Sequence, residues 1–214
     1  YYFKLKKGYY EFPIAELEKF ESARSKRKME RKDDYEAPNL VVRDIDVDEN
    51  GGIFMALEEY RLVISTYYDG RGRSTTTYTY YYEDIIGAKI SASGNFDWLR
   101  KVPKKQKGVD ANATLGFKLV SDATGYYFLY LDNKRNLELE EDEVPKYHLN
   151  GYGGQVMVSK LDKEGKLSRE IVFDTREEDV MFFPRRLRRL NGTQFIGRAK
   201  MKRGDYKPLL ITVN

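Results

Sequence analysis

Short apolar runs separated by polar turns recur along this chain. Residues 85–96 and 156–167 align without a gap, with Gly94 and Gly165 in equivalent positions 71 residues apart. In both stretches an apolar run ends in a small polar turn that closes on glycine, and a second run follows. Glycine suits such a turn because it adopts a positive φ without a Cβ clash. The pattern predicts β-hairpins of one kind, with a shorter copy at residues 3–10.

A second kind of hairpin lies between these. Its turns fall at residues 48–52, 121–125 and 191–192, and apolar runs flank each turn. Asn191 and Gly192 form the strongest short hairpin signal in the chain. The two kinds of hairpin alternate, so the sequence predicts tandem units of four antiparallel strands.

Tandem four-stranded units are typical of β-propeller blades. The sequence therefore predicts an all-β fold of about three four-stranded antiparallel blades, which form a partial ring over residues 40–214. The expected blades cover about 40–107, 112–175 and 180–214. Residues 1–12 are expected to be the hairpin of the third and fourth strands of a preceding blade.

One short helix is expected near the N-terminus. Pro13 suits a first helical turn, and Ile14, Leu17 and Phe20 form a short apolar stripe. The chain is almost continuously charged beyond this stripe. Residues 13–39 are therefore predicted to be a short amphipathic helix followed by a charged, solvated linker.

Residues 88–98 carry a family resemblance. This segment resembles the repeat of quinoprotein-type propellers, in which an Ala, a Ser/Thr-Gly pair and a Trp have this spacing, although Ile90 stands where that repeat usually has Asp. The later copy has Arg169 in place of Trp98. Residues 40–214 are also similar to uncharacterised secreted bacterial propeller proteins. The resemblance implies a bacterial protein with an extracytoplasmic location: periplasmic, cell-surface or secreted.

Propellers close with about four to eight blades, and terminal repeats need protected faces. Three blades leave two faces bare. We therefore expect these residues to be the C-terminal part of a propeller, completed by a missing N-terminal stretch of the same chain or by a partner chain.

The composition limits the kinds of functional site and partner that the chain can have. The 38 basic and 34 acidic residues are interspersed and leave a net charge of +4, so a nucleic-acid partner is not expected. The absence of cysteine excludes disulfides, thiolate metal sites and a cysteine nucleophile. No apolar run approaches the length of a membrane-spanning helix, and no motif predicts a cofactor.

An aromatic insertion follows residues 69–70. Strand alternation predicts that Tyr78, Tyr80 and Tyr82 share one face of a hairpin that reaches back toward residues 62–66, with Tyr81 on the other face. These three tyrosines are candidate ligand-binding residues. Trp98, four residues after a turn glycine, is expected to be buried between neighbouring sheets.

Two basic segments are candidates for function. Alternation on a strand places Arg186 and Arg188 on one face, with Leu187 and its neighbours on the other. Arginine grips anions bidentately, so these two are candidate ligand-binding residues, whereas cross-strand pairing with acidic residues is the structural alternative. The lysines around Pro103 are interpreted as an exposed connection: Lys101, Lys104, Lys105 and Lys107.

Two other sequence patterns do not indicate a metal site or a catalytic site. Asp44, Asp46 and Asp48 lack the glycine and glutamate that an EF-hand loop requires, so we expect no metal there. His148 is the only histidine, has no motif around it, and is expected to be solvent-facing or hydrogen-bonded. No catalytic residue is predicted.

Three functions stay open. The first is a non-catalytic binding or scaffold module with a carbohydrate or protein ligand. The second is a glycan-active propeller enzyme that uses carboxylates in the channel. The third is a basic patch, built from residues 25–32 and 185–189, that binds a polyanion with a steep salt dependence.

Overall fold

The computed structural model describes residues 10–31, 39–109, 114–150, 153–190, 194–201 and 204–212. These residues form a mostly β structure with two short α-helices and two 3₁₀ turns, η1 and η2. The elements, in chain order, are α1 (Ile14–Leu17), α2 (Ala23–Glu30), β1 (Leu40–Val47), β2 (Ile53–Tyr68), β3 (Ser74–Ile90), β4 (Phe96–Val102), β5 (Gln106–Val109), β6 (Phe117–Asp122), β7 (Gly125–Asp132), η1 (Lys134–Asn136), β8 (His148–Leu149), β9 (Gln155–Asp162), β10 (Leu167–Asp174), β11 (Val180–Met181), η2 (Pro184–Arg186), β12 (Arg188–Arg189), β13 (Gln194–Met201) and β14 (Tyr206–Thr212).

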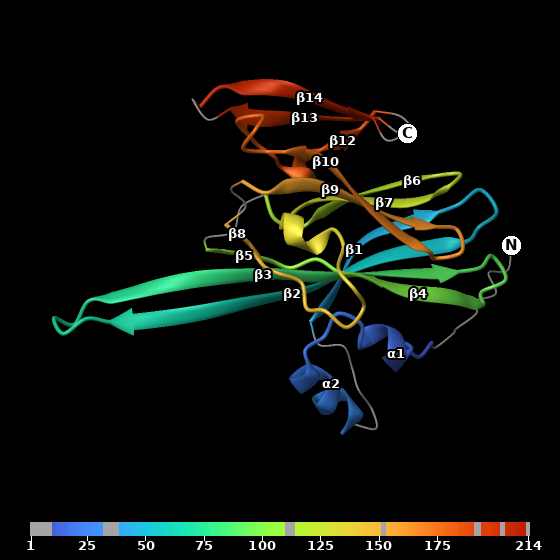
Figure 1. The fold of residues 1–214 in the computed structure, drawn as a ribbon, viewed down its shortest axis with the longest axis horizontal. Helices are drawn as coiled ribbons and strands as arrows, with labels where there is room; N and C mark the ends of the chain where they lie inside the picture. The colour runs from blue at the N-terminus through green and yellow to red at the C-terminus, as the bar shows by residue number, and fades with distance from the viewer. Residues whose placement is uncertain are drawn as a thin grey trace, which may run out of the picture.

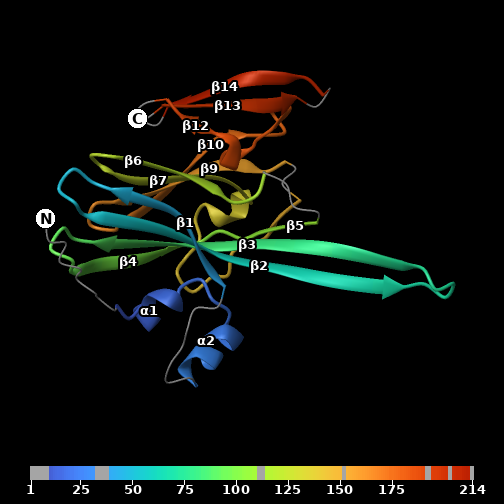
Figure 2. The same ribbon diagram turned by 180° about the vertical axis from the view of Figure 1, so that it is seen from behind.

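Three sheets lie on top of one another (Figure 1). Sheet A has the order β1-β2-β3-β5-β8, with β4 also paired to β3. Sheet B has the order β10-β9-β7-β6, and in sheet C β13 pairs with β11 and β12 on one side and with β14 on the other. The long β2–β3 hairpin projects from the stack, as both views show (Figures 1 and 2).

The hairpins expected from the glycine pattern are present. The β3–β4 turn contains Gly94 and the β9–β10 turn contains Gly165, with φ of +79° and +83°. The β1–β2 and β6–β7 hairpins also form at their expected turns. The predicted copy at residues 3–10 and the turn at 191–192 lie outside the described residues, apart from Tyr10.

An aromatic core joins sheet A to sheet B. Phe54 of β2 stacks on Tyr126 of β7 with a centroid distance of 3.6 Å. Trp98 is 9% exposed, packs in the same cluster, and donates from Nε1 to the Lys163 carbonyl at 3.0 Å. The prediction that Trp98 is buried between sheets is confirmed.

A second apolar layer joins sheet B to sheet C, and it contains Leu129, Phe182, Phe195 and Ile211. Every residue of β7 is buried because this central strand lies between two neighbouring sheets. On the far side of sheet A, Leu17 of α1 packs against Ile86 and Leu99.

The expectation of one helix followed by a charged linker is wrong. The charged run contains a second helix, α2, because Ser22 caps its N-terminus by accepting from the Ser25 N–H at 3.2 Å. Met29 is buried, and the lysines and arginines of this run are good helix formers.

The three sheets also differ from the three similar four-stranded blades that the sequence predicted. Sheet A gains β5 and β8, and the first strand of sheet C is divided into β11 and β12 by η2. The stack is open, and the described residues form no closed ring. No helix among them is long and apolar enough to cross a membrane.

Candidate functional site

Sheet A bends at one level, where its pairing register shifts in several strands. Arg43 is an extra residue in β1, and Glu59 of β2 faces both Glu83 and Asp84 of β3. At the same level, residues 103–105 separate β4 from β5. Bulges bend a strand and re-aim its side chains. Here they turn charged side chains into the interior.

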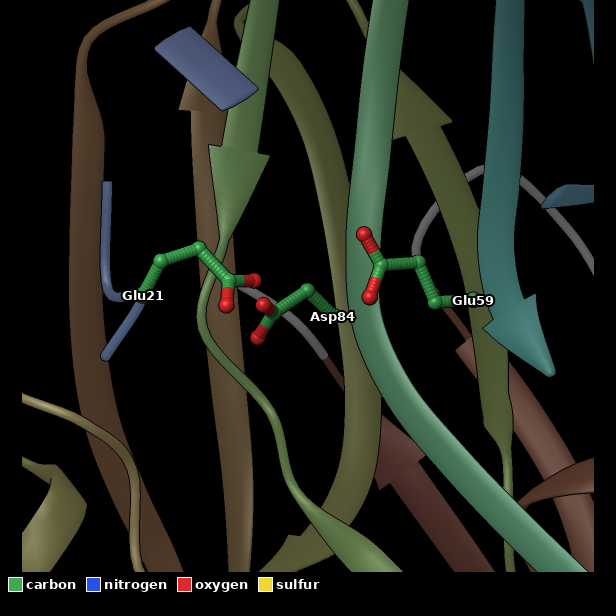
Figure 3. Close-up of side chains that lie close together, drawn as sticks. All are labelled: Glu21, Glu59 and Asp84. Carbon is green, nitrogen blue, oxygen red and sulfur yellow. The ribbon is translucent and has the colours of Figure 1, made fainter. Parts of the chain in front are cut away.

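One group of these charges surrounds Lys101, whose side chain is fully buried. Its Nζ lies 2.8 Å from Glu21 and 3.0 Å from Asp84, and it donates to the Leu17 carbonyl at 3.0 Å. Figure 3 shows the carboxylates of Glu21, Asp84 and Glu59 near one another. The lysine therefore ties the segment between α1 and α2 to the bend of sheet A.

The three carboxylates are close enough to hold a metal ion, since their oxygens lie within 4.8 Å of one another. Lys101, however, already supplies a cation to two of them. Burial, with Asp84 nearby, raises the pKa of Glu59 to about 8, and burial also raises the pKa of Asp84. Glu59 is thus protonated at neutral pH, and the group fits a structural clamp better than a metal site.

A second group surrounds Lys104, whose side chain is also fully buried. Its Nζ lies 2.8 Å from Glu58 and donates to the Tyr82 carbonyl at 3.0 Å, while Arg43 binds the other Glu58 oxygen at 2.7 Å. The interpretation of Lys101 and Lys104 as part of an exposed connection is therefore wrong. Their carboxylate partners are distant in sequence, so the local pattern could not reveal them.

An inner cavity of about 320 Å³ lies beside this second group. Sheets A, B and C each contribute to its wall, through β1, β6 and η2. Its lining residues are Val42, Arg43, Asp44, Glu58, Phe117, Lys118, Leu119 and Arg185.

A larger cavity of about 600 Å³, the arginine cavity, lies on sheet C. Ile196 and Leu210 on this side are exposed, whereas the alternate residues Phe195 and Ile211 face sheet B. The cavity thus occupies the outer face of the stack. Its lining residues are Arg185, Arg186, Leu187, Arg188, Ile196, Gly197, Arg198, Tyr206 and Pro208, and none is acidic.

Arg186 and Arg188 line the same cavity, but Arg186 belongs to a 3₁₀ turn and Leu187 lines the cavity as well, so the predicted alternation along a strand is not observed. The strand neighbour of Arg188 is Ile196 and that of Arg189 is Phe195, so neither residue directly opposite is acidic; pairing of these arginines with acidic residues stays a prediction.

Residues of β13 and β14 that line this cavity were not predicted from the sequence, among them Arg198 and Tyr206. Arg198 comes from β13, and its guanidinium lies 5.4 Å from the ring centroid of Tyr206 in β14. Arg198 and Lys200 alternate along one strand, which is a visible pattern. Only strand pairing, however, brings Arg198 beside residues 186–188.

The other basic segment lies at the opposite end of the stack. Arg24, Arg27, Lys28 and Arg31 line a cavity of about 630 Å³ on α2, below sheet A, whereas β12 belongs to the far sheet (Figure 1). The two basic segments therefore do not form a single patch.

The tyrosines of the insertion lie on the projecting hairpin. Tyr80 is opposite Leu62 and Tyr78 is opposite Ile64, so both predictions about strand face and register are confirmed. Tyr82 shares the same face but is buried at the base, where Arg185 donates to its hydroxyl at 3.1 Å. The three tyrosines therefore do not form one exposed surface.

The remaining candidates are structural. Asp48 accepts from the backbone N–H groups of Asn50 and Gly52 and pairs with Lys89 at 2.7 Å, so it stabilises a turn. His148 is buried, and among the described residues its Nε2 has no hydrogen-bond partner, so the expectation of a solvent-facing or hydrogen-bonded histidine is wrong for this atom. Burial lowers the pKa of His148 to about 4.

Comparison of the chain with protein-family models, with curated proteins and with solved structures finds no match.

Proposed function

We propose that the chain is a non-catalytic binding module of propeller-like blades and that it binds an anionic oligosaccharide in the arginine cavity. The observation that carries this proposal is the lining of that cavity: Arg186, Arg188 and Arg198 gather there beside Arg185, which also donates to Tyr82, and none of the described lining residues is acidic. Like charges held together repel one another, and an anionic ligand relieves that repulsion.

The chemistry of the lining favours a ligand with carboxylate or sulfate groups on rings. The forked guanidinium matches both groups bidentately. Tyr206 and Pro208 add flat apolar surface on which a sugar ring can rest. The volume of about 600 Å³ lies within the range of about 300–1,000 Å³ that is usual for small-ligand sites.

Two features support the blade interpretation. Sheets A, B and C are consecutive in the chain, and each contributes to the wall of the inner cavity. In a propeller, blades repeat radially around a central channel. A secreted or cell-envelope location in a bacterium stays a prediction.

The carboxylates of the inner side favour binding over catalysis. A glycosidase needs one carboxyl group that donates a proton and a second that attacks or activates water. Asp44 and Glu58 both line the inner cavity, but Glu58 is held by Arg43 and Lys104. The glycan-active enzyme therefore gains no support from this geometry.

The test is calorimetric titration of the whole chain with a sulfated hexasaccharide and with an oligogalacturonate. We expect both to bind, and we expect Arg188→Ala with Arg198→Ala to weaken binding by at least about tenfold, since each charge-assisted hydrogen bond contributes about 1.5–3 kcal/mol. Maltohexaose, which is neutral, should not bind.

The matched control is Arg24→Ala with Arg27→Ala, which removes the same charge from the opposite end of the stack. This variant should bind within about twofold of the wild type. An equal loss in both double variants would point to non-specific attraction and overturn the proposal. Tighter binding of single-stranded DNA through Arg188 and Arg198 would reassign the site to nucleic acid.

A further inference from the structure

The β2–β3 hairpin extends beyond the stack as an arm, defined here as residues 60–68 and 74–82 (Figures 1 and 2). Strand β1 pairs with β2 only as far as Glu59. Among the described residues, the outer edge of β2 from Arg61 to Tyr68 therefore has no strand partner.

This edge lacks the features that normally protect a strand edge. Natural edges carry lysines, prolines or bulges that prevent pairing with another chain. Between Arg61 and Asp69, β2 contains no charge, proline or glycine, although 34% of the whole chain is charged. Ile64 is 57% exposed and Tyr67 is 72% exposed.

We propose that this edge pairs with the same edge of a second copy, antiparallel, about a two-fold axis at Ser65. An isologous contact of this kind places each residue of one copy opposite its symmetry mate. Leu62 then faces Tyr68, Val63 faces Tyr67 and Ile64 faces Thr66. Aromatic and β-branched residues pair favourably across strands.

The paired segment, residues 62–68 of each copy, is called the seam. The charged residues that flank the seam select this register. With the axis at Ser65, Arg61 of each copy faces Asp69 of the other. An axis at Ile64 would place Glu59 opposite Asp69, and an axis at Thr66 would place Arg61 opposite Arg71. Like charges directly opposite each other destabilise a strand pair, so both neighbouring two-fold registers are disfavoured.

The backbone agrees with the same register. The N–H of Tyr60 donates to the Asn39 carbonyl on the β1 side of β2. Because backbone groups alternate along a strand, those of Leu62, Ile64, Thr66 and Tyr68 point to the outer edge. These are the residues that the proposed register brings into hydrogen-bonded pairs, and Ser65 forms a non-hydrogen-bonded pair with its mate.

The experiment uses the absence of cysteine from the chain. In the proposed dimer the two Ser65 Cα atoms lie about 4.5 Å apart, within the range for a disulfide. Mild oxidation of the Ser65→Cys variant should therefore give a covalent dimer on a non-reducing gel. Thr77 lies opposite Ser65 on β3, one strand further from the axis. Its cysteine variant is the matched control and should stay monomeric, since three strand spacings separate the two sites by about 14 Å.

The unmodified chain should show a concentration-dependent dimer by light scattering. The seam spans seven residues, or about 23 Å, so we expect a weak and reversible contact. Ser65→Lys places like charges on the axis and should abolish the dimer, whereas Thr77→Lys should retain it. A wild-type chain that stays monomeric at about 1 mM would overturn the proposal. Equal crosslinking of the two cysteine variants would also overturn it.

Discussion

The two halves of the β2–β3 hairpin share one antiparallel pairing pattern but have opposite surroundings. In the inner half, Phe54 is fully buried and stacks on Tyr126 of the next sheet. In the outer half, Ile64 and Tyr67 are exposed, and their strand has no neighbour on one edge within the described ranges. The boundary between the halves is the bend with its buried lysines.

This difference shows that strand pairing and burial have separate origins. Cross-strand pairs and a turn are enough to define the ribbon, but a two-stranded ribbon is only marginally stable alone. The arm therefore depends on the inner half, where packing against sheet B supplies most of the stabilisation.

The largest effect is expected from Phe54→Ala. Loss of a buried phenylalanine usually costs about 3–5 kcal/mol, and this ring also loses its stacking partner. Ile64→Ala in the arm should cost less than about 0.5 kcal/mol in dilute solution. Urea unfolding of both variants measures the difference, and similar losses would mean that the arm is packed.

Lys101→Met should cost about 3 kcal/mol, because it leaves Glu21 and Asp84 buried without their cation. The loss should be smaller at pH 5 than at pH 8, since burial raises the pKa of Asp84 and this carboxyl group takes up a proton more readily at the lower pH. Arg61→Met, which removes an exposed partner of Glu83 at 3.4 Å, should cost less than about 1 kcal/mol. Equal costs would contradict the assignment of Lys101 as a buried clamp.

The buried carboxyl group of Asp132 is expected to make the stability of the fold depend on pH. Its Oδ1 accepts from Asn133 and Asn136, its Oδ2 has no hydrogen-bond partner in the described part of the chain, and burial raises the pKa of this carboxyl to about 7. The folded state therefore holds its proton more tightly than the unfolded state, and stability falls as pH rises from about 4 to 7.

Asp132→Asn keeps the accepting oxygen but does not ionise. Between pH 5 and pH 8, this variant should lose about 2 kcal/mol less stability than the wild type. Chemical unfolding at the two pH values checks this difference. Parallel pH profiles for the two proteins would show that Asp132 is ionised at no cost in the folded state.

The smallest expected difference in stability is between alanine substitutions at two turn glycines. Gly165 and Gly72 both have positive φ, at +83° and +76°. A Cβ at Gly165 would lie 2.9 Å from the Trp98 ring, whereas nothing lies within 4 Å at Gly72. Gly72→Ala should cost about 1 kcal/mol from the backbone alone. Gly165→Ala should cost about 1 kcal/mol more, and equal melting shifts would argue against tight packing of Trp98 on that turn.

The sequence was most informative about hairpins, whose structure is local. Turn glycines at 94 and 165, the alternation of Tyr78 and Tyr80, and the repeat position of Trp98 each depend on neighbours within one hairpin, and all were predicted. Helix α2 was missed because its charges suggested a solvated linker, although the capping residue Ser22 was visible.

The buried charges and the arginine cavity were only partly predictable. Lys101 and Lys104 lie in a lysine-rich segment that looks exposed, and their burial depends on Glu21 and Glu58, which are distant in sequence. Arg186 and Arg188 were singled out by their local run. Arg198 joins them only through the pairing of separate strands, which no local pattern specifies.

Hydrogen exchange along β2 tests the comparison most directly, since one strand passes through both environments. Amides of residues 54–57 should exchange slowly at every protein concentration, because they lie in the stack. Amides of residues 62–68 whose N–H groups point to the outer edge should exchange quickly in dilute solution and slowly at high concentration, where the second copy covers them. Equal protection of both halves in dilute solution, or no change in the outer half with concentration, would contradict the account.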